Sequence, residues 1–242
     1  MNIFTKVTCL LSAVTMLIAT NPVCASAEEF ESDIRLDNAV VDMSEYQDYL
    51  DTLSDEQMEA ALEKEALMNS LSMQNGAEIQ AVTATKLSIP GTFTMYQQET
   101  DTYCGSACVK SLLMYVNGSS PTQSSINSSI NNSFTAIPNY VNSRQSNCQY
   151  LLVTSPTQAN LQTCVYMDIT NDEVPTFLRL NGTSSPSWYY ATNGHCVLSN
   201  AIYSDKSIIQ IADPLGGRVS GCLYFYEKSA STVSSYTTHV CY

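Results

Sequence analysis

Residues Gln98–Ala107 read QETDTYCGSA, and the place of the cysteine in this stretch decides how the rest of the chain is interpreted. The apolar spacing predicts a helix over Tyr103–Val116, ended by an Asn-Gly pair, with the cysteine in its first turn. A helix N-terminus carries partial positive charge, which lowers the pKa of a thiol and favours the thiolate. Gly105 and Ala107 leave room for another backbone to approach. The stretch therefore predicts that Cys104 is a nucleophile and that Gly105 lies beside the group it attacks. The alternative is a buried structural cysteine.

Two groups near Cys104 are candidates to stabilise negative charge on a reacting oxygen. The backbone N–H of Cys104 has no intrahelical partner, because the first donors of a helix are unpaired. The side chain of Gln98, six residues earlier, is a candidate second donor. The alternative for Gln98 is an ordinary polar loop residue, since Gln97 stands next to it.

A second stretch supplies a candidate base and a candidate carboxylate. Gly194 and His195 open an apolar run that predicts a strand, and the polar turn Ser204–Lys206 follows it. The next run, Ile208–Ala212, ends directly before Asp213. A hairpin of this length brings Asp213 beside His195, where a carboxylate fixes the tautomer of an imidazole. The alternatives are a core histidine and an aspartate that caps a turn.

These motifs resemble one family of enzymes. The blocks Gln98…Cys104-Gly105-x-Ala107 and Gly194-His195…Asp213-Pro214-x-Gly216-Gly217 are similar to the papain-like cysteine peptidases of the bacteriocin-leader-processing type (cysteine peptidase family 39-like). The resemblance implies a papain-like fold over 89–242, although only about 93–118 and 193–218 carry recognisable motif. It implies the following roles: oxyanion donor Gln98, nucleophile Cys104, general base and acid His195, and orienting residue Asp213.

The chain also departs from that family. Well-known members are fused to exporters and cut leaders after Gly-Gly inside the cell, whereas no transporter region accompanies these motifs here and the chain is expected to be exported. Cleavage after double glycine is therefore not carried over. The expected partner is a peptide or protein substrate. Gly105, Gly194 and Trp188 are the candidate substrate-binding residues, and Trp188 has the alternative role of capping a sheet.

Residues 1–27 predict a secretory signal peptide. A basic start is followed by the apolar stretch Val7–Ala19, which is too short to span a membrane comfortably, and Ala25-Ser26-Ala27 provides small residues for cleavage after Ala27. A membrane anchor and a lipid-attached Cys24 are the alternatives. The expected location is secreted, either extracellular or at the cell surface.

Export favours disulfide bonds among the cysteines that remain after the signal peptide. Seven remain: Cys104, Cys108, Cys148, Cys164, Cys196, Cys222 and Cys241. The odd count leaves at least one thiol without an intramolecular partner. A Cys104–Cys108 bond is unfavourable, because Cβ atoms one helical turn apart lie about 5–6 Å from each other and a disulfide needs about 3.5–4.5 Å. No CxxC pair is present and the two histidines are far apart, so we expect no metal and no cofactor.

Residues 28–88 form a separate acidic segment. They contain 15 of the 23 acidic residues but three of the ten basic ones, and the net charge of −13 argues against nucleic acid or anionic lipid as a partner. Apolar spacing predicts helices over Ser44–Met73, with a capping box at Ser54 and Gln57 that opens the second. Ala77–Ser88 has the composition of a linker. We expect a propeptide that acts as an intramolecular inhibitor; the alternative is a spacer or a partner-binding arm.

The order of elements in residues 89–242 predicts an α+β domain, in which a leading helix carries the nucleophile and packs on an antiparallel sheet. Val174–Leu180 is either helix or strand, and the predicted strands are Tyr150–Val153, Cys164–Ile169, Cys196–Tyr203, Ile208–Ala212 and Cys222–Tyr226. Three functions fit the sequence. They are a secreted cysteine peptidase kept as a zymogen, a papain-like amidase or acyltransferase, and a disulfide-stabilised surface module that binds a partner without catalysis.

Overall fold

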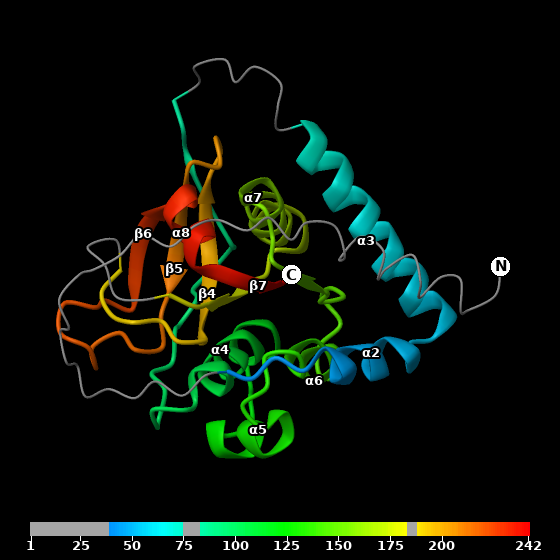
Figure 1. Cartoon of the computed structure of the whole chain (residues 1–242), viewed down its shortest axis with the longest axis horizontal. Coiled ribbons are helices and arrows are strands. Elements are labelled where there is room, and N and C mark those ends of the chain that lie inside the picture. The colour runs from blue at the N-terminus through cyan, green and yellow to red at the C-terminus, as the bar shows by residue number, and fades with distance from the viewer. Residues whose placement is uncertain (1–38, 75–82, 183–187) are drawn as a thin grey trace. The chain divides into compact units, whose positions relative to one another are not determined.

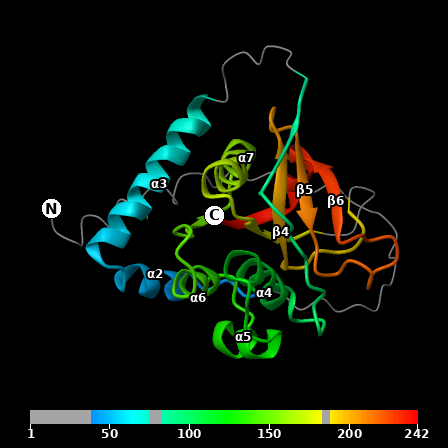
Figure 2. The same ribbon diagram turned by 180° about the vertical axis from the view of Figure 1, so that it is seen from behind.

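A computed structural model describes residues 39–74, 83–182 and 188–242 of the chain (Figure 1). The expected signal peptide, the acidic residues before Ala39 and the predicted helix end at Asn75-Gly76 lie outside the described residues. The described residues combine helices with one antiparallel sheet, as expected for the α+β class (Figures 1 and 2). None of the described helices is both long and apolar enough to cross a membrane.

The sheet is built around β4 (His195–Tyr203), the strand that begins with the candidate base. Its strand order is β2 (Leu152–Thr154), β7 (Thr237–Cys241), β3 (Thr176–Leu180), β4, β5 (Ile208–Ala212) and β6 (Phe225–Ser229), and β1 (Lys86–Ser88) also pairs with β4. β3 pairs with the first half of β4, and β1 continues along the second half. The predicted β4–β5 hairpin is confirmed by the pairing of Leu198 with Ala212.

Helices pack on both faces of the sheet, because successive side chains of β4 point to opposite faces. Cys196 and Leu198 lie in a core with α4 (Cys104–Asn117), α5 (Gln123–Ile130) and α6 (Ile137–Asn142), whereas Val197 lies in a second core with α7 (Gln158–Met167) and α8 (Ala230–Tyr236). The helix predicted over Tyr103–Val116 is confirmed as Cys104–Asn117, and it is capped by Gly118, whose left-handed φ of 69° favours glycine. The helix that carries Cys104 therefore packs directly on the strand that begins with His195.

The described part of the acidic segment, from Ala39 on, belongs to the same compact unit as the body. It contains α2 (Met43–Asp51), which joins the core of α4, and α3 (Asp55–Gln74), which joins the core of α7. The capping box is confirmed: the Ser54 N–H donates to Gln57 Oε1 at 3.0 Å, and the Gln57 N–H donates to Ser54 Oγ at 3.2 Å. The expected linker is shorter than its composition suggests, because its last three residues form β1.

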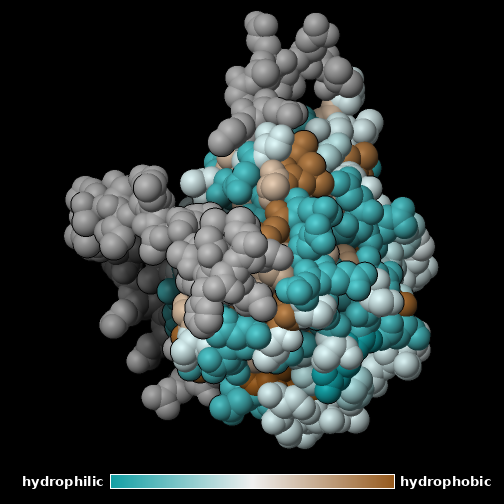
Figure 3. Space-filling model, turned by 90° about the vertical axis from the view of Figure 1, so that its right-hand side faces the viewer, coloured by the Kyte–Doolittle hydropathy of each residue, from teal (hydrophilic) through white to brown (hydrophobic). Residues whose placement is uncertain are grey.

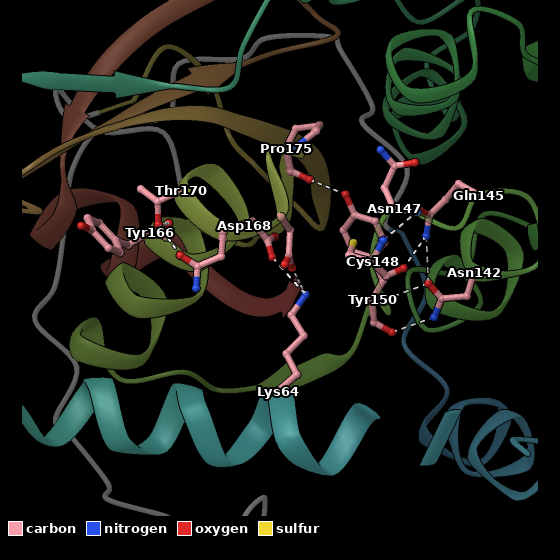
Figure 4. A network of polar contacts seen from close by, with 12 residues as sticks. Lys64, Asn142, Gln145, Asn147, Cys148, Tyr150, Tyr166, Asp168, Thr170 and Pro175 are labelled. Carbon is pink, nitrogen blue, oxygen red and sulfur yellow. Dashed lines mark hydrogen bonds and ion pairs between the residues drawn. The ribbon is translucent and has the colours of Figure 1, made fainter. Parts of the chain in front are cut away.

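Helix α3 is attached to the body by the apolar side chains of Ala61 and Met68 and by the ammonium of Lys64. The Lys64 ammonium lies 3.3 Å from Asp168 Oδ1 and 2.7 Å from Asp172 Oδ2, both on the π-helical turn η1 (Asp168–Asp172) (Figure 4). It also lies 5.0 Å from the centre of the Tyr242 ring. On the side that α3 occupies, the surface is mostly hydrophilic and hydrophobic residues form small patches (Figure 3). The contact of α3 with the body therefore combines an apolar stripe with a buried ion pair.

Several predicted strands differ from the structure. The strand predicted over Cys164–Ile169 is wrong: these residues belong to α7 and η1, because Leu161, Cys164 and Val165 are spaced to bury one helical face and Thr157 caps the helix by accepting from the Asn160 N–H. The strand predicted from Cys222 begins only at Phe225, after a run of turns. The segment left as helix or strand at Val174–Leu180 is strand β3. The sequence pattern predicts neither α8 nor β7.

Candidate active site

Cys104 is the first residue of α4, and its side chain is buried. No side chain caps this helix end, so the first-turn N–H groups and their partial positive charge face the thiol. Gly105, expected beside the substrate, faces the opposite way: a Cβ added there would lie 3.7 Å from Ile130 and 3.8 Å from Ile137, on α5 and α6. Its small size therefore serves helix packing in this structure, and a role in substrate binding stays a prediction.

His195 and Asp213 lie together as the hairpin geometry predicts. His195 is the first residue of β4, Asp213 follows the end of β5, and the His195 Nε2 to Asp213 Oδ1 distance is 2.9 Å. The imidazole and the Cys104 thiol also act on each other: their interaction lowers the pKa of the thiol and raises that of the histidine. Because Nε2 is used by Asp213, Nδ1 is the ring nitrogen left for the thiol. The structure thus groups Cys104, His195 and Asp213, with a hydrogen bond between the last two.

The Asp213 carboxylate is held by further donors, two of which the sequence analysis missed. Its Oδ1 accepts the N–H of Leu215 at 2.9 Å. Its Oδ2 accepts the Tyr226 hydroxyl at 2.7 Å and also the hydroxyl of Tyr190, whose ring stands edge-on to the His195 imidazole. Tyr190 stands two residues after Trp188, but no spacing rule joins it or Tyr226 to the aspartate. The carboxylate is therefore fixed in orientation from both oxygens.

Burial and charge act in opposite directions on these three groups. Burial raises the pKa of Asp213. The charge and hydrogen bond of His195 and the hydrogen bonds of the two tyrosines outweigh burial, so the pKa of Asp213 lies below its usual value. Burial lowers the pKa of His195, but the charge and hydrogen bond of Asp213 outweigh it and raise the pKa to about 10. Burial raises the pKa of Cys104, but its hydrogen bond to His195 and the charge of that residue lower it overall. At neutral pH the geometry favours a thiolate–imidazolium pair.

The other cysteines have a different character. Cys108, one helical turn after Cys104, is buried and its thiol donates to the Cys196 carbonyl at 3.4 Å. Burial raises the pKa values of the following thiols: Cys108, Cys148, Cys164, Cys222 and Cys241. All seven cysteines within the described ranges are free thiols, and disulfide pairing stays a prediction.

Gln98 is buried near the Asp213 turn, but its amide is already used. The Nε2 amide group of Gln98 donates to two backbone carbonyls, that of Thr100 at 2.8 Å and that of Asp101 at 3.1 Å. Its Oε1 is buried without a hydrogen-bond partner among the described residues. The backbone N–H of Gln98 donates to Pro214 O at 3.0 Å, which fixes this loop to the turn after Asp213. A Gln98 oxyanion donor requires the side chain to turn, and that role stays a prediction.

Comparison with known proteins adds no assignment. No family model, no curated protein and no solved structure matches this chain. The chemistry of the site therefore rests on its own residues. Within the described part of the chain, no three His, Cys, Asp or Glu side chains are grouped so that they could hold a metal ion.

The two remaining candidate substrate residues lie in different places. Gly194 has a φ of 78°, in the left-handed region that favours glycine, and it turns the chain into β4 directly before His195. Trp188 is 4% exposed and lies in the core on the α7 face, with its ring centre 5.0 Å from that of Tyr236. Its neighbour Tyr189 is 41% exposed. This geometry favours the capping role for Trp188, and its contact with substrate stays a prediction.

Proposed function

We propose that this protein is a cysteine peptidase with a papain-like arrangement of nucleophile helix and sheet. The observation that carries the proposal is the buried His195–Asp213 pair, 2.9 Å from ring nitrogen to carboxylate oxygen, whose imidazole acts on Cys104 at the start of α4 and lowers the pKa of its thiol. A nucleophile, a base and a residue that orients the base are the parts that covalent acyl transfer needs. The motif resemblance described above supports the same assignment.

The first half of the reaction forms an acyl-enzyme. The Cys104 thiolate attacks the carbonyl carbon of the substrate, a C–S bond forms, and the carbonyl electron pair moves to the oxygen. The Cys104 N–H at the start of α4 stabilises this oxyanion. The oxyanion then collapses, the C–N bond breaks, and the His195 imidazolium donates its proton to the leaving nitrogen. The products are an amine and a thioester on Cys104.

The second half of the reaction releases the acid. Neutral His195 takes a proton from water, and the resulting hydroxide attacks the thioester carbon. The C–S bond breaks, the thiolate returns to Cys104, and His195 is again protonated. Asp213 holds the imidazole in place and stabilises its charge throughout, because its carboxylate stays ionised.

The proposal includes the setting in which the enzyme works. The chain is exported through the signal peptide at 1–27, and residues 28 to about 88 form a propeptide on the body. The packing of α2 and α3 into the two cores supports an intramolecular role for this segment more than a role as a free arm.

The test is site-specific labelling of the secreted, unreduced protein with iodoacetamide, followed by intact mass and peptide mapping. We expect label on Cys104 near neutral pH, loss of this label in Cys104→Ala, and slow labelling in His195→Ala. Cys108→Ala is the matched control, because Cys108 lies on the same helix with a raised pKa. A disulfide-bonded Cys104 would instead support the binding module.

Labelling is followed by cleavage of a peptide library. Release of free acid from peptide bonds supports the peptidase. Transfer of the acyl group to an added amine, or hydrolysis of side-chain amides alone, would assign the same site to an acyltransferase or amidase.

A further inference from the structure

The residues before α2 lie against the candidate active site. The Ala39 N–H donates to the carbonyl of Gly194 at 3.2 Å, and Gly194 directly precedes His195. The Ala39 carbonyl accepts from Arg179 Nε at 2.8 Å. The Ala39 side chain is 2% exposed and belongs to the same core as Cys104. A backbone segment far from the site in sequence is thus bonded to the residue next to the catalytic base.

The following residue continues this contact. The Val40 N–H donates to Asn132 O at 2.9 Å, and the Val40 carbonyl accepts the Phe134 N–H at 2.8 Å, which forms a parallel bridge to Ser133. The Val40 side chain is 52% exposed. We call Ala39 and Val40 the N-terminal strip. The hydrogen bonds of the strip all use its backbone. The Ala39 side chain is enclosed, and the Val40 side chain faces solvent.

Arg179 connects the strip to the catalytic centre. It lies on β3 opposite Cys196, the residue after His195. Its Nη1 donates to Thr238 Oγ1 at 2.9 Å, which fixes the guanidinium in place. Burial lowers the pKa of Arg179, while Cys196 and Cys104 act in the opposite direction. Arg179 is therefore a cationic donor that already holds a backbone carbonyl, that of Ala39, across from the residue after His195.

We propose that the N-terminal strip fills the substrate groove of this site, and that the groove takes an extended peptide with a small residue in the position of Ala39, held by Arg179 and Gly194. This inference rests on the proposed function. The contacts of the strip use N–H and C=O groups that every peptide carries, as in recognition by strand addition. The enclosed position accepts a methyl group, so side-chain size there selects the substrate. The strip is then a resident occupant that substrate must replace.

The first test uses the full chain and the rate at which iodoacetamide labels Cys104. Ala39→Phe does not fit the enclosed position, so we expect the strip to leave and labelling to accelerate about tenfold, the order that follows from losing one or two hydrogen bonds. Val40→Phe is the matched control: it adds similar bulk to the open side of the same strip, and we expect the wild-type rate. Arg179→Gln, which weakens the hold on the Ala39 carbonyl, is a second route to faster labelling if Ala39→Phe does not fold.

The second test asks whether the vacated groove accepts a peptide. We expect a synthetic peptide with the sequence of residues 36–43, LDNAVVDM, to protect Cys104 from labelling in Ala39→Phe. The same peptide with Phe in place of the alanine should not protect, and Arg179→Gln in the Ala39→Phe background should weaken protection by the original peptide.

The outcomes separate the two proposals. If labelling depends on His195 but neither the strip variants nor the peptide change it, the strip is only a structural strap and the groove assignment is overturned, while the peptidase proposal stands. If Cys104 labelling in Ala39→Phe is indifferent to His195→Ala, the activated thiolate is absent and the proposed function fails. Protection by both peptides equally would overturn the selection for a small residue.

Discussion

Tyr226 donates a 2.7 Å hydrogen bond to Oδ2 of Asp213, the carboxylate oxygen that His195 does not use. Loss of this donor leaves a buried carboxylate with one hydrogen bond fewer. We expect Tyr226→Phe to lower the free energy of unfolding by about 1.5–3 kcal/mol, the range for hydrogen bonds to charged groups. Urea unfolding at pH 7 measures it. Tyr189→Phe, which removes a hydroxyl from a partly exposed ring next to Tyr226, should change stability little.

The same substitution has a pH signature. The tyrosine hydroxyl helps to keep the pKa of Asp213 low, so its removal raises that pKa. A group with a depressed folded-state pKa contributes stability that is present above its unfolded pKa of about 3.8 and is lost as pH falls through the folded value. Tyr226→Phe should therefore lose stability at a higher pH during acid titration than the wild-type chain. An unchanged acid transition would mean that the hydroxyl does not act on the carboxylate.

In the proposed mechanism, Asp213 sets the alkaline limit of activity. Its charge and hydrogen bond raise the pKa of His195 to about 10, so the imidazolium proposed to protonate the leaving group persists well above neutral pH. In Asp213→Asn the charge is gone. We expect the alkaline limb of kcat/KM to move to lower pH and the maximum to fall by up to about 10⁴-fold. A pH–rate profile checks both, with Asp205→Asn in the β4–β5 turn as control. A reduced rate with an unmoved alkaline limb would contradict the assignment of Asp213 to the base.

The Lys64 ion pair anchors α3 to the body. Replacement by Met leaves the fully buried Asp168 without its cation, and breaking a buried pair in this way costs about 3–5 kcal/mol. We expect Lys64→Met to unfold at a correspondingly lower urea concentration. Lys86→Met removes the more exposed pair with Glu227 and should cost about 1 kcal/mol or less. Equal losses of unfolding free energy in the two variants would show that burial does not strengthen the contribution of the Lys64 ion pair.

Asp168 makes stability depend on pH near neutrality. Burial, the largest influence, raises the pKa of its carboxyl to about 7 against the pull of Lys64, from 3.8 in the unfolded chain. Between these values the folded chain binds the extra proton, so stability falls as pH rises from about 4 to about 7. Asp168→Asn should flatten this part of the stability curve. Thermal unfolding at several pH values measures it, and a slope that survives in the variant would assign the dependence to another group.

The sequence predicts the features that depend on neighbours along the chain. The helix start at Cys104, the capping box at Ser54 and the hairpin that joins His195 to Asp213 follow from caps, turns and short loops, and the structure confirms each. The apolar run at Cys164–Ile169 was misassigned because such a run fits a buried strand as well as a helix, and only packing between α3 and the sheet decides between them.

The features that sequence patterns did not reveal are contacts between distant segments. Arg179 and Ala39 are separated by 140 positions, and Lys64 and Asp168 by 104. The tyrosines on Asp213 come from a loop and from β6, whose start was itself displaced in the prediction. The residue types alone do not predict these contacts, because each of these residue types also occurs as an ordinary surface or core residue.

Strand β1 constrains where the chain can be processed. Lys86–Ser88 pair with Ala201–Tyr203, so these three residues complete the edge of β4 although they belong by composition to the acidic segment. A cut before Lys86 releases α2, α3 and the N-terminal strip and leaves the sheet intact. A cut after Ser88 would remove β1 from this edge and expose unpaired backbone groups along Ala201–Tyr203. Removal of the proposed propeptide by a cut before Lys86 would thus leave a chain whose first strand is already paired with β4.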